Sequence, residues 1–140
     1  IGPDFRNKTS EPINIRSVKV ARGDSAVELV GIRAYQMKDF DDAYVFNWCS
    51  SDDKEGNPAT KDSRPVVGAT VAPGRNLVGQ RGFTMLEFRV PKVGTWKVES
   101  IDVEYEQNGK RYSQQLSTRY DVIVAPNPES RGAYHEKYSR

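Results

Sequence analysis

Two clusters of carboxylate side chains have the residue types of a metal site. The clusters comprise Asp39, Asp41 and Asp42, and then Asp52, Asp53 and Glu55. Loops rich in oxygen ligands suit Ca²⁺, and loops from one end of a domain can share a site. Neither cluster has EF-hand spacing, because Lys54 stands where a ligand would be expected and no Glu follows at the required distance. We therefore predict solvated acidic loops and assign no metal-ligating residue, with Ca²⁺ binding kept as an alternative.

Residues for nucleophilic or acid–base catalysis are scarce. His135 is the single histidine and Cys49 the single cysteine among 140 residues. A single histidine disfavours Ser–His and Cys–His arrangements, and a single cysteine excludes an internal disulfide and a zinc site built on thiolates. The paired carboxylates lie in polar segments with nothing nearby to raise a pKa. We therefore predict that the protein is not an enzyme and has neither a catalytic residue nor a cofactor.

The tetrapeptide Arg22-Gly23-Asp24-Ser25 could serve recognition. It is similar to the integrin-recognition sequence, and a tight turn between strands can display such a motif. Gly, Asp and Ser are also ordinary turn residues, so a Gly-Asp turn with a flanking Arg is the interpretation that we favour. Arg22, Gly23 and Asp24 are kept as candidate interaction residues.

A glycine-rich basic segment is a second candidate interaction site. Arg75 and Arg81 lie within it, and its glycines are Gly74, Gly79 and Gly82. Such a loop could cradle an anion, but the segment lacks Walker spacing and a Lys-Ser/Thr pair. Turn geometry is therefore the interpretation that we favour for the glycines, with Arg75 and Arg81 kept as candidate interaction residues.

Charge and aromatic residues set the expected partners. The chain has 21 Lys and Arg against 19 Asp and Glu, so it has no strong field for nucleic acid or anionic membranes. The positive charge of Lys110, Arg111 and Arg119 is offset by nearby carboxylates, which are Glu104, Glu106 and Asp121. We therefore predict no nucleic-acid partner. No apolar run approaches the ~18 residues of a membrane helix, and we predict no membrane span. Tyr134 and Tyr138 lie in a polar tail that could dock on a neighbouring subunit.

Two sequence features bear on carbohydrate. Asn7-Lys8-Thr9 fits the acceptor pattern for N-glycosylation, which matters only in a secreted eukaryotic protein. Trp48 and Trp96 could form a stacking platform for a sugar. We favour core packing for Trp48, because Phe46 shares its predicted face. Carbohydrate is kept as an alternative ligand.

Period-two alternation of apolar residues predicts an all-β protein. The predicted strands are Pro12–Val20, Val27–Gln36, Ala43–Cys49, Val66–Ala72, Phe83–Val90, Thr95–Gln107 and Lys110–Val124. The alternation slips phase within three of them, which predicts bulges near Arg16–Ser17 and near Glu99–Ser100. Asn108-Gly109 predicts a two-residue type I′ hairpin turn, and Ser50–Pro65 predicts a long polar loop.

These elements predict one domain. The strands, with turn residues between them, are typical of an antiparallel β-sandwich of about seven strands. The predicted boundaries are an N-terminal extension over residues 1–11, the β-sandwich over residues 12–126 and a polar C-terminal tail over residues 127–140. Hydrophobic residues make up 36% of the chain, which suffices for sheets that each bury one face.

Three features resemble an immunoglobulin-like or fibronectin-like sandwich. Trp48 lies on the third predicted strand, where such domains place a core tryptophan. The segment Pro91–Val98 is similar to the turn before the penultimate strand of many bacterial members, with Trp96 in place of the tyrosine of Gly-Thr-Tyr. The hairpin Ile101–Val124 resembles their closing strands. The resemblance implies an immunoglobulin-like antiparallel β-sandwich, a module that serves in adhesins, spacers, assembly subunits or ligand-binding domains.

Two classes of function follow. The first is a non-catalytic structural or protein–protein interaction module of an adhesion, appendage or surface subunit, which works through edge-strand pairing or loop-tip contacts. Its expected partner is another protein or a second copy of the chain. The second is a sandwich that binds carbohydrate or Ca²⁺ through its loops. The chain starts with Ile rather than Met, and we expect an extracellular or cell-envelope protein.

Overall fold

A computed structural model describes residues 2–36, 63–79 and 82–124. Within these ranges the chain forms β-strands and no helix, and every strand pair is antiparallel. The predicted all-β class is therefore confirmed for the described residues. The predicted strand Ala43–Cys49, most of the predicted loop Ser50–Pro65 and the predicted tail lie outside them.

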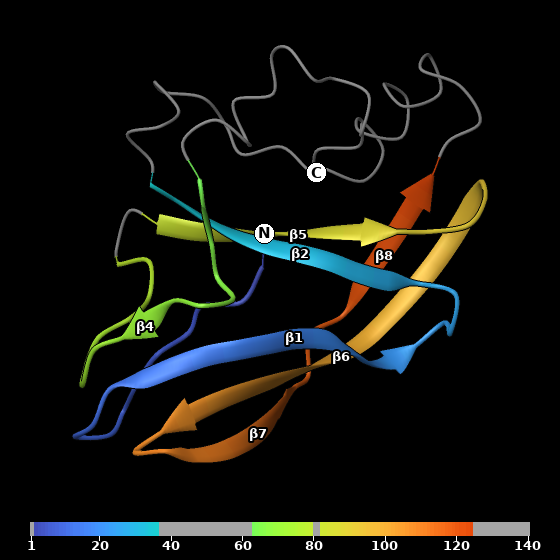
Figure 1. Ribbon diagram of the computed structural model, residues 1–140. Coiled ribbons are helices and arrows are strands. Elements are labelled where there is room, and N and C mark those ends of the chain that lie inside the picture. The colour runs from blue at the N-terminus through green and yellow to red at the C-terminus, as the bar shows by residue number, and fades with distance from the viewer. Residues whose placement is uncertain (1, 37–62, 80–81, 125–140) are drawn as a thin grey trace.

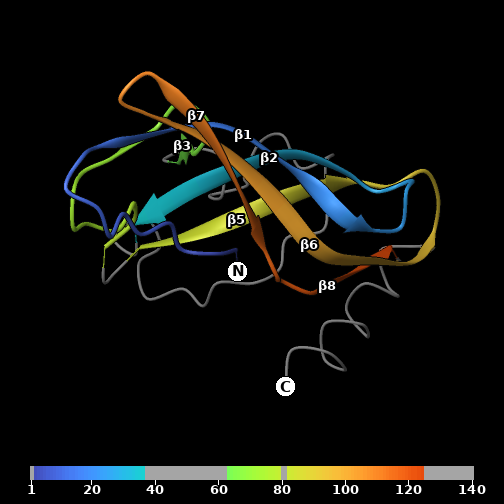
Figure 2. The same cartoon turned by 90° about the horizontal axis from the view of Figure 1, so that it is seen from below.

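The strands form two sheets, which lie one above the other in Figure 1 and cross in Figure 2. The five-stranded sheet contains β1 (Ile13–Gly23), β4 (Thr70–Val71), β6 (Gly94–Gln107), β7 (Lys110–Leu116) and β8 (Tyr120–Val124). Its order is β4-β1-β6-β7, and β8 also pairs with β6. The three-stranded sheet contains β2 (Glu28–Gln36), β3 (Arg64–Pro65) and β5 (Gly82–Arg89), in the order β3-β2-β5. The arrangement is a sandwich-like pair of antiparallel sheets.

The core lies where alternate residues of the two sheets face one another. Ile15 and Val103 from the five-stranded sheet share a buried cluster with Ile32 and Ala34 from β2. A second cluster surrounds Ile101, which is fully buried. Burying a side chain of this size contributes roughly 1.5–3 kcal/mol, so these few alternating positions supply the main attraction between the sheets.

Bulges bring both phases of the long strands into this core. The β1–β6 register shifts between Ile15 and Ser17, as the phase slip near Arg16–Ser17 predicts. It then passes from Arg22 opposite Ser100 to Gly23 opposite Val98, so Glu99 is left without a partner in β1. An extra residue in a strand reverses the faces that follow it. Both predicted bulges are therefore confirmed.

Two predicted strands are shorter or divided. Of Val66–Ala72 only Thr70–Val71 is a strand, because Val66–Ala69 forms a turn closed by a 3.0 Å bond from the Ala69 N–H to the Val66 carbonyl. The predicted return strand Lys110–Val124 is interrupted, since the Thr118 N–H donates to the Leu116 carbonyl at 3.0 Å. With the short β3, the described residues contain eight strands, where about seven were predicted for the whole chain.

The segment before β1 pairs with the rest of the fold. Phe5 is buried, and its carbonyl accepts the Leu77 N–H at 2.8 Å. Asn7 is only 2% exposed, and its side-chain amide donates to the carbonyls of Glu11 (2.6 Å) and Val71 (3.0 Å). Residues of the predicted N-terminal extension thus contribute to the interior, and Asn7 has a structural role there.

The three-stranded sheet is also apolar on its outer face. Tyr35 on β2 lies opposite Phe83 on β5, and their rings stack with centroids 5.1 Å apart. Both are buried, and Met85 packs against them. Burial raises the pKa of the Tyr35 phenol, an effect that the Ser63 hydroxyl and Arg33 partly offset.

Candidate functional site

Strand β7 forms an open edge of the five-stranded sheet. Within the described part of the chain it pairs with β6 alone, and every residue of Lys110–Leu116 except Leu116 is exposed. The strand contains no proline. An unpaired edge presents backbone N–H and C=O groups that can add another strand. We call this feature the β7 edge.

The hairpin turn decides which backbone groups face the β7 edge. Asn108 and Gly109 have φ values of 52° and 75°, and Gln107 lies opposite Lys110. These two positive φ angles are those of a type I′ turn, so the turn predicted for Asn108-Gly109 is confirmed. In such a hairpin the pair flanking the turn is hydrogen-bonded, and bonded and non-bonded pairs then alternate. The N–H and C=O groups of Arg111, Ser113 and Gln115 therefore point away from β6, toward the open edge.

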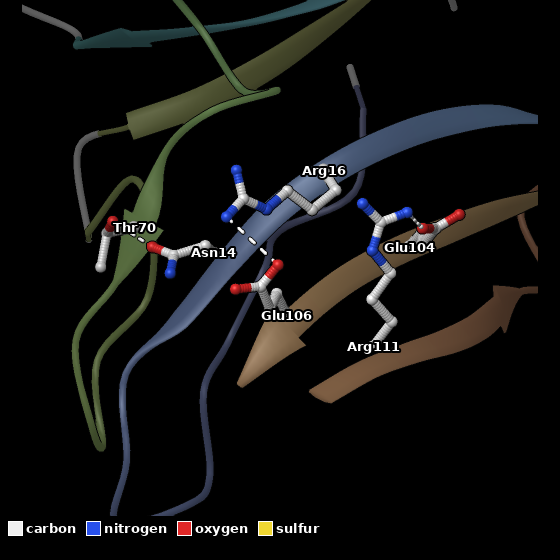
Figure 3. A network of polar contacts seen from close by, with 6 residues as sticks. All are labelled: Asn14, Arg16, Thr70, Glu104, Glu106 and Arg111. Carbon is white, nitrogen blue, oxygen red and sulfur yellow. Dashed lines mark hydrogen bonds and ion pairs between the residues drawn. The ribbon is translucent and has the colours of Figure 1, made fainter. Parts of the chain in front are cut away.

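Arginine and glutamate side chains from three neighbouring strands of this sheet form two ion pairs (Figure 3). An acidic row on β6 comprises Asp102, Glu104 and Glu106. Arg16 on β1 pairs with Glu106 at 3.2 Å, and Arg111 on β7 pairs with Glu104 at 3.1 Å. Exposed pairs of this kind contribute little to stability. The second pair does direct the Arg111 side chain toward Glu104 on its own sheet.

The opposite face of β7 carries an aromatic pair. Tyr105 on β6 lies directly opposite Tyr112, and their rings stack with centroids 5.5 Å apart and an interplanar angle of 21°. Tyr112 is 42% exposed, whereas Leu116 at the far end of β7 packs against the core. The strand is thus fixed at both ends, and no other strand of the described residues pairs with its outer edge.

The predicted recognition motif lies at another corner of the same sheet. Arg22 precedes the turn as predicted, but Gly23 also belongs to β1, so its predicted place in the turn is wrong. The turn runs from Asp24 to Val27. The Asp24 N–H donates to the Lys97 carbonyl at 2.8 Å, and the Asp24 carboxylate accepts the Lys97 N–H at 2.7 Å. Asp24 therefore continues the hydrogen bonding between β1 and β6 past the end of β1, with its carboxylate as the acceptor for the Lys97 N–H. Gly23 is required here, because its φ is 147° and a Cβ would collide with the Lys97 carbonyl.

A shallow depression borders this corner. It has a volume of about 330 Å³ and is lined by Lys97, Val98, Glu99, Arg119, Tyr120 and Asp121. It forms where the β6 bulge meets the interruption between β7 and β8. Burial raises the pKa of the Tyr120 phenol, which the nearby Thr118 hydroxyl partly offsets. We call it the β6–β8 depression.

The remaining predicted residues do not gather with these surfaces. Arg75 is exposed in a turn beside the N-terminal segment, where its carbonyl accepts the Asn7 N–H at 2.9 Å. Gly74 and Gly79 have φ values of 69° and 61°, as turn geometry predicts. Arg81, Tyr134 and Tyr138 lie outside the described residues, as do both acidic clusters, so these predictions stay predictions.

Two features are absent from residues 2–36, 63–79 and 82–124. No group of three or more His, Cys, Asp or Glu side chains there could hold a metal ion. No helix there is long and apolar enough to cross a membrane.

The chain matches no protein-family model, no curated protein and no solved structure. Edge-strand pairing is predicted from the sequence as a mode of interaction, but no strand is assigned to it. Alternation predicted the strand that forms the β7 edge, but whether a strand lies at an edge depends on which strands pair.

Proposed function

We propose that this protein is a non-catalytic interaction module that captures an extended protein segment at the β7 edge. The observation that carries the proposal is a seven-residue strand that is exposed over six residues and, among residues 2–36, 63–79 and 82–124, is paired with β6 alone. Strand addition draws its affinity from backbone hydrogen bonds and its specificity from alternate side chains. An extracellular or cell-envelope assembly, such as an adhesin or appendage, is the setting in which we place this activity.

The other long outer strand is less suited to strand addition. On β5 the edge is interrupted near its start, where the Gly2 N–H donates to the Thr84 carbonyl at 2.6 Å. The hydroxyl of Thr84 also bonds the Pro3 carbonyl at 2.7 Å. The N-terminal segment thus occupies positions that an added strand would need. This contrast supports β7 as the capture edge.

Kinship with immunoglobulin-like or fibronectin-like modules is part of the proposal. Its support is Trp96, whose indole N–H donates to the Lys92 carbonyl at 3.1 Å. In such sandwiches a tyrosine near the start of the penultimate strand bonds the backbone a few residues upstream. Trp96 makes an equivalent bond at the start of β6, with a nitrogen donor in place of the phenol.

A selection from a display library of random heptapeptides tests the proposed function. Ser113→Pro removes an N–H that faces the open edge while sparing the bonds to β6, since edge strands tolerate proline at such positions. Ser113→Ala is the matched control, because it keeps the N–H. We expect the selected peptides to bind the unaltered chain and Ser113→Ala, and to lose at least ten-fold in affinity for Ser113→Pro. Equal binding to all three proteins would contradict capture at the β7 edge.

The β6–β8 depression favours a second candidate function, the binding of a sugar or Ca²⁺. It offers one aromatic ring, Tyr120, together with carboxylates from Glu99 and Asp121. A ligand that binds only the folded state raises the melting temperature. Thermal unfolding with CaCl₂ or with simple sugars tests this candidate. A rise in melting temperature that Asp121→Asn removes and Ser113→Pro leaves unchanged would support it, and no rise would overturn it.

A further inference from the structure

Strand β7 can pair with itself in only a few ways. An antiparallel ladder between two copies must match edge-facing residues with edge-facing residues, and these are Arg111, Ser113 and Gln115. A two-fold axis at Ser113 matches all seven residues of the strand. It places Lys110 opposite Leu116, Arg111 opposite Gln115 and Tyr112 opposite Gln114, with Ser113 opposite its own copy.

Other registers are disfavoured by charge or by strand length. An axis at Arg111 puts the two Arg111 side chains directly opposite each other, and an axis at Tyr112 puts them on a close diagonal. Axes beyond Ser113 pair the strand with residues past Leu116, where the Thr118–Leu116 bond ends regular pairing. A parallel ladder with each residue facing its own copy sets Arg111 beside Arg111. Cations on edge strands commonly block pairing. On β7 both cations, Lys110 and Arg111, lie at the N-terminal end of the strand. They therefore disfavour the other registers and leave the one centred on Ser113.

We propose that the captured segment is β7 of a second copy, so that two five-stranded sheets join about a two-fold axis at Ser113. This inference rests on the proposed function and names its partner. The fit of the strand to its own reverse carries it, because all seven residues find a partner, neither Lys110 nor Arg111 meets a like charge, and Arg111 meets the neutral amide of Gln115. One strand is a smaller surface than the ~800 Å² per partner of a stable interface. We therefore expect a weak dimer, with a Kd in the micromolar range or above.

Two substitutions at Gln115 report this register. Gln115→Glu sets two carboxylates opposite the two Arg111 side chains of the dimer, whereas Gln115→Arg sets two further cations there. Each variant loses the same 2.8 Å bond from the Gln115 amide to the Ser100 hydroxyl. Within one chain Gln115 lies opposite Asp102, so Arg at this position should favour the fold and Glu should disfavour it. Effects on dimerisation and on stability thus have opposite signs.

Sedimentation velocity of the full chain, from about 5 µM to about 1 mM, tests the dimer. We expect concentration-dependent dimerisation of the unaltered chain and of Ser113→Ala, and none for Ser113→Pro. Cross-strand charge pairs contribute roughly 0.2–1 kcal/mol each, so Gln115→Glu should tighten the dimer about 2- to 30-fold and Gln115→Arg weaken it similarly. If Ser113→Pro perturbs the fold, the two variants Gln115→Glu and Gln115→Arg still test the register, because they should change the dimer Kd in opposite directions.

The outcomes separate this inference from the proposed function. A chain that stays monomeric throughout, or a dimer that both Gln115 variants change in the same direction, would overturn self-pairing. If heptapeptides still bind in a way that Ser113→Pro abolishes, the proposed function stands and its partner is a different protein. If neither peptides nor a second copy depend on Ser113, both proposals fail.

Discussion

Tyr105 and Tyr112 lie directly opposite each other on β6 and β7, and their rings stack with centroids 5.5 Å apart. The stack ties the exposed strand to the centre of the sheet near the hairpin turn. A strand held straight before binding loses less conformational entropy when it pairs. Under the proposed function, the aromatic pair would hold the β7 edge in the conformation that an added strand requires.

Tyr112→Ala should loosen the β7 edge. Stacked aromatic pairs contribute roughly 0.5–1.5 kcal/mol beyond the area they bury, and we expect a loss of about 1 kcal/mol in the free energy of unfolding. Urea denaturation measures this loss. Ser113→Ala on the same strand is the control and should change the free energy by less than about 0.5 kcal/mol. An unchanged midpoint for Tyr112→Ala would show that the stack does not hold β7 in place.

Gly109→Ala should destabilise the hairpin turn. Gly109 has a φ of 75°, a conformation that costs a residue with a Cβ roughly 1–2 kcal/mol. Gly31→Ala is the matched control, because a Cβ there meets nothing within 4 Å and φ is not in the left-handed region. Thermal unfolding should therefore separate the two variants by several degrees. Equal melting temperatures would contradict the type I′ turn.

Local sequence patterns predicted the features that depend on neighbouring residues. Asn108-Gly109 predicted its own turn, because both residues tolerate positive φ angles. The phase slips at Arg16–Ser17 and Glu99–Ser100 predicted bulges, because an extra residue reverses the faces that follow it. Both signals lie within a few residues of the structure that they predict.

Features that depend on distant pairing could not be predicted in this way. The buried Asn7 side chain donates a hydrogen bond to the carbonyl of Val71, which lies 64 residues away in the sequence. The stack of Tyr35 on Phe83 depends on the register between β2 and β5. The openness of β7 has the same origin, since it depends on the whole strand order. The strand that provides the candidate site could not be assigned for that reason.

Asn7→Ala tests the role of the N-terminal segment. The substitution removes the bonds that the buried Asn7 amide donates to the carbonyls of Glu11 and Val71, and each such bond contributes roughly 0.5–1.5 kcal/mol. Asn76→Ala removes an exposed bond, to the Asp4 carboxylate at 2.6 Å, and should cost about 0.5 kcal/mol or less. Chemical denaturation compares the two. A smaller loss for Asn7→Ala than for Asn76→Ala would contradict a structural role for Asn7.

Alkaline pH should destabilise the fold through Tyr120. Burial raises the pKa of its phenol in the folded state above the ordinary 10.0. A folded-state pKa above the unfolded value means that stability is complete below about pH 10 and falls as the pH rises through the folded-state pKa. Tyr120→Phe removes this titration. Its unfolding free energy should therefore fall less between about pH 9 and pH 11 than that of the unaltered chain, and equal slopes would contradict the assigned cause.

Amide hydrogen exchange along β7, followed by NMR at low and high protein concentration, tests the central claim most directly. In dilute solution we expect the amides of Tyr112 and Gln114, which bond β6, to be protected, and those of Arg111, Ser113 and Gln115 to exchange freely. At high concentration the second group should become protected as well, because its N–H groups pair across the two-fold axis. Protection of Arg111, Ser113 and Gln115 that stays the same at both concentrations, in the presence and absence of selected heptapeptides, would contradict an open capture edge at β7.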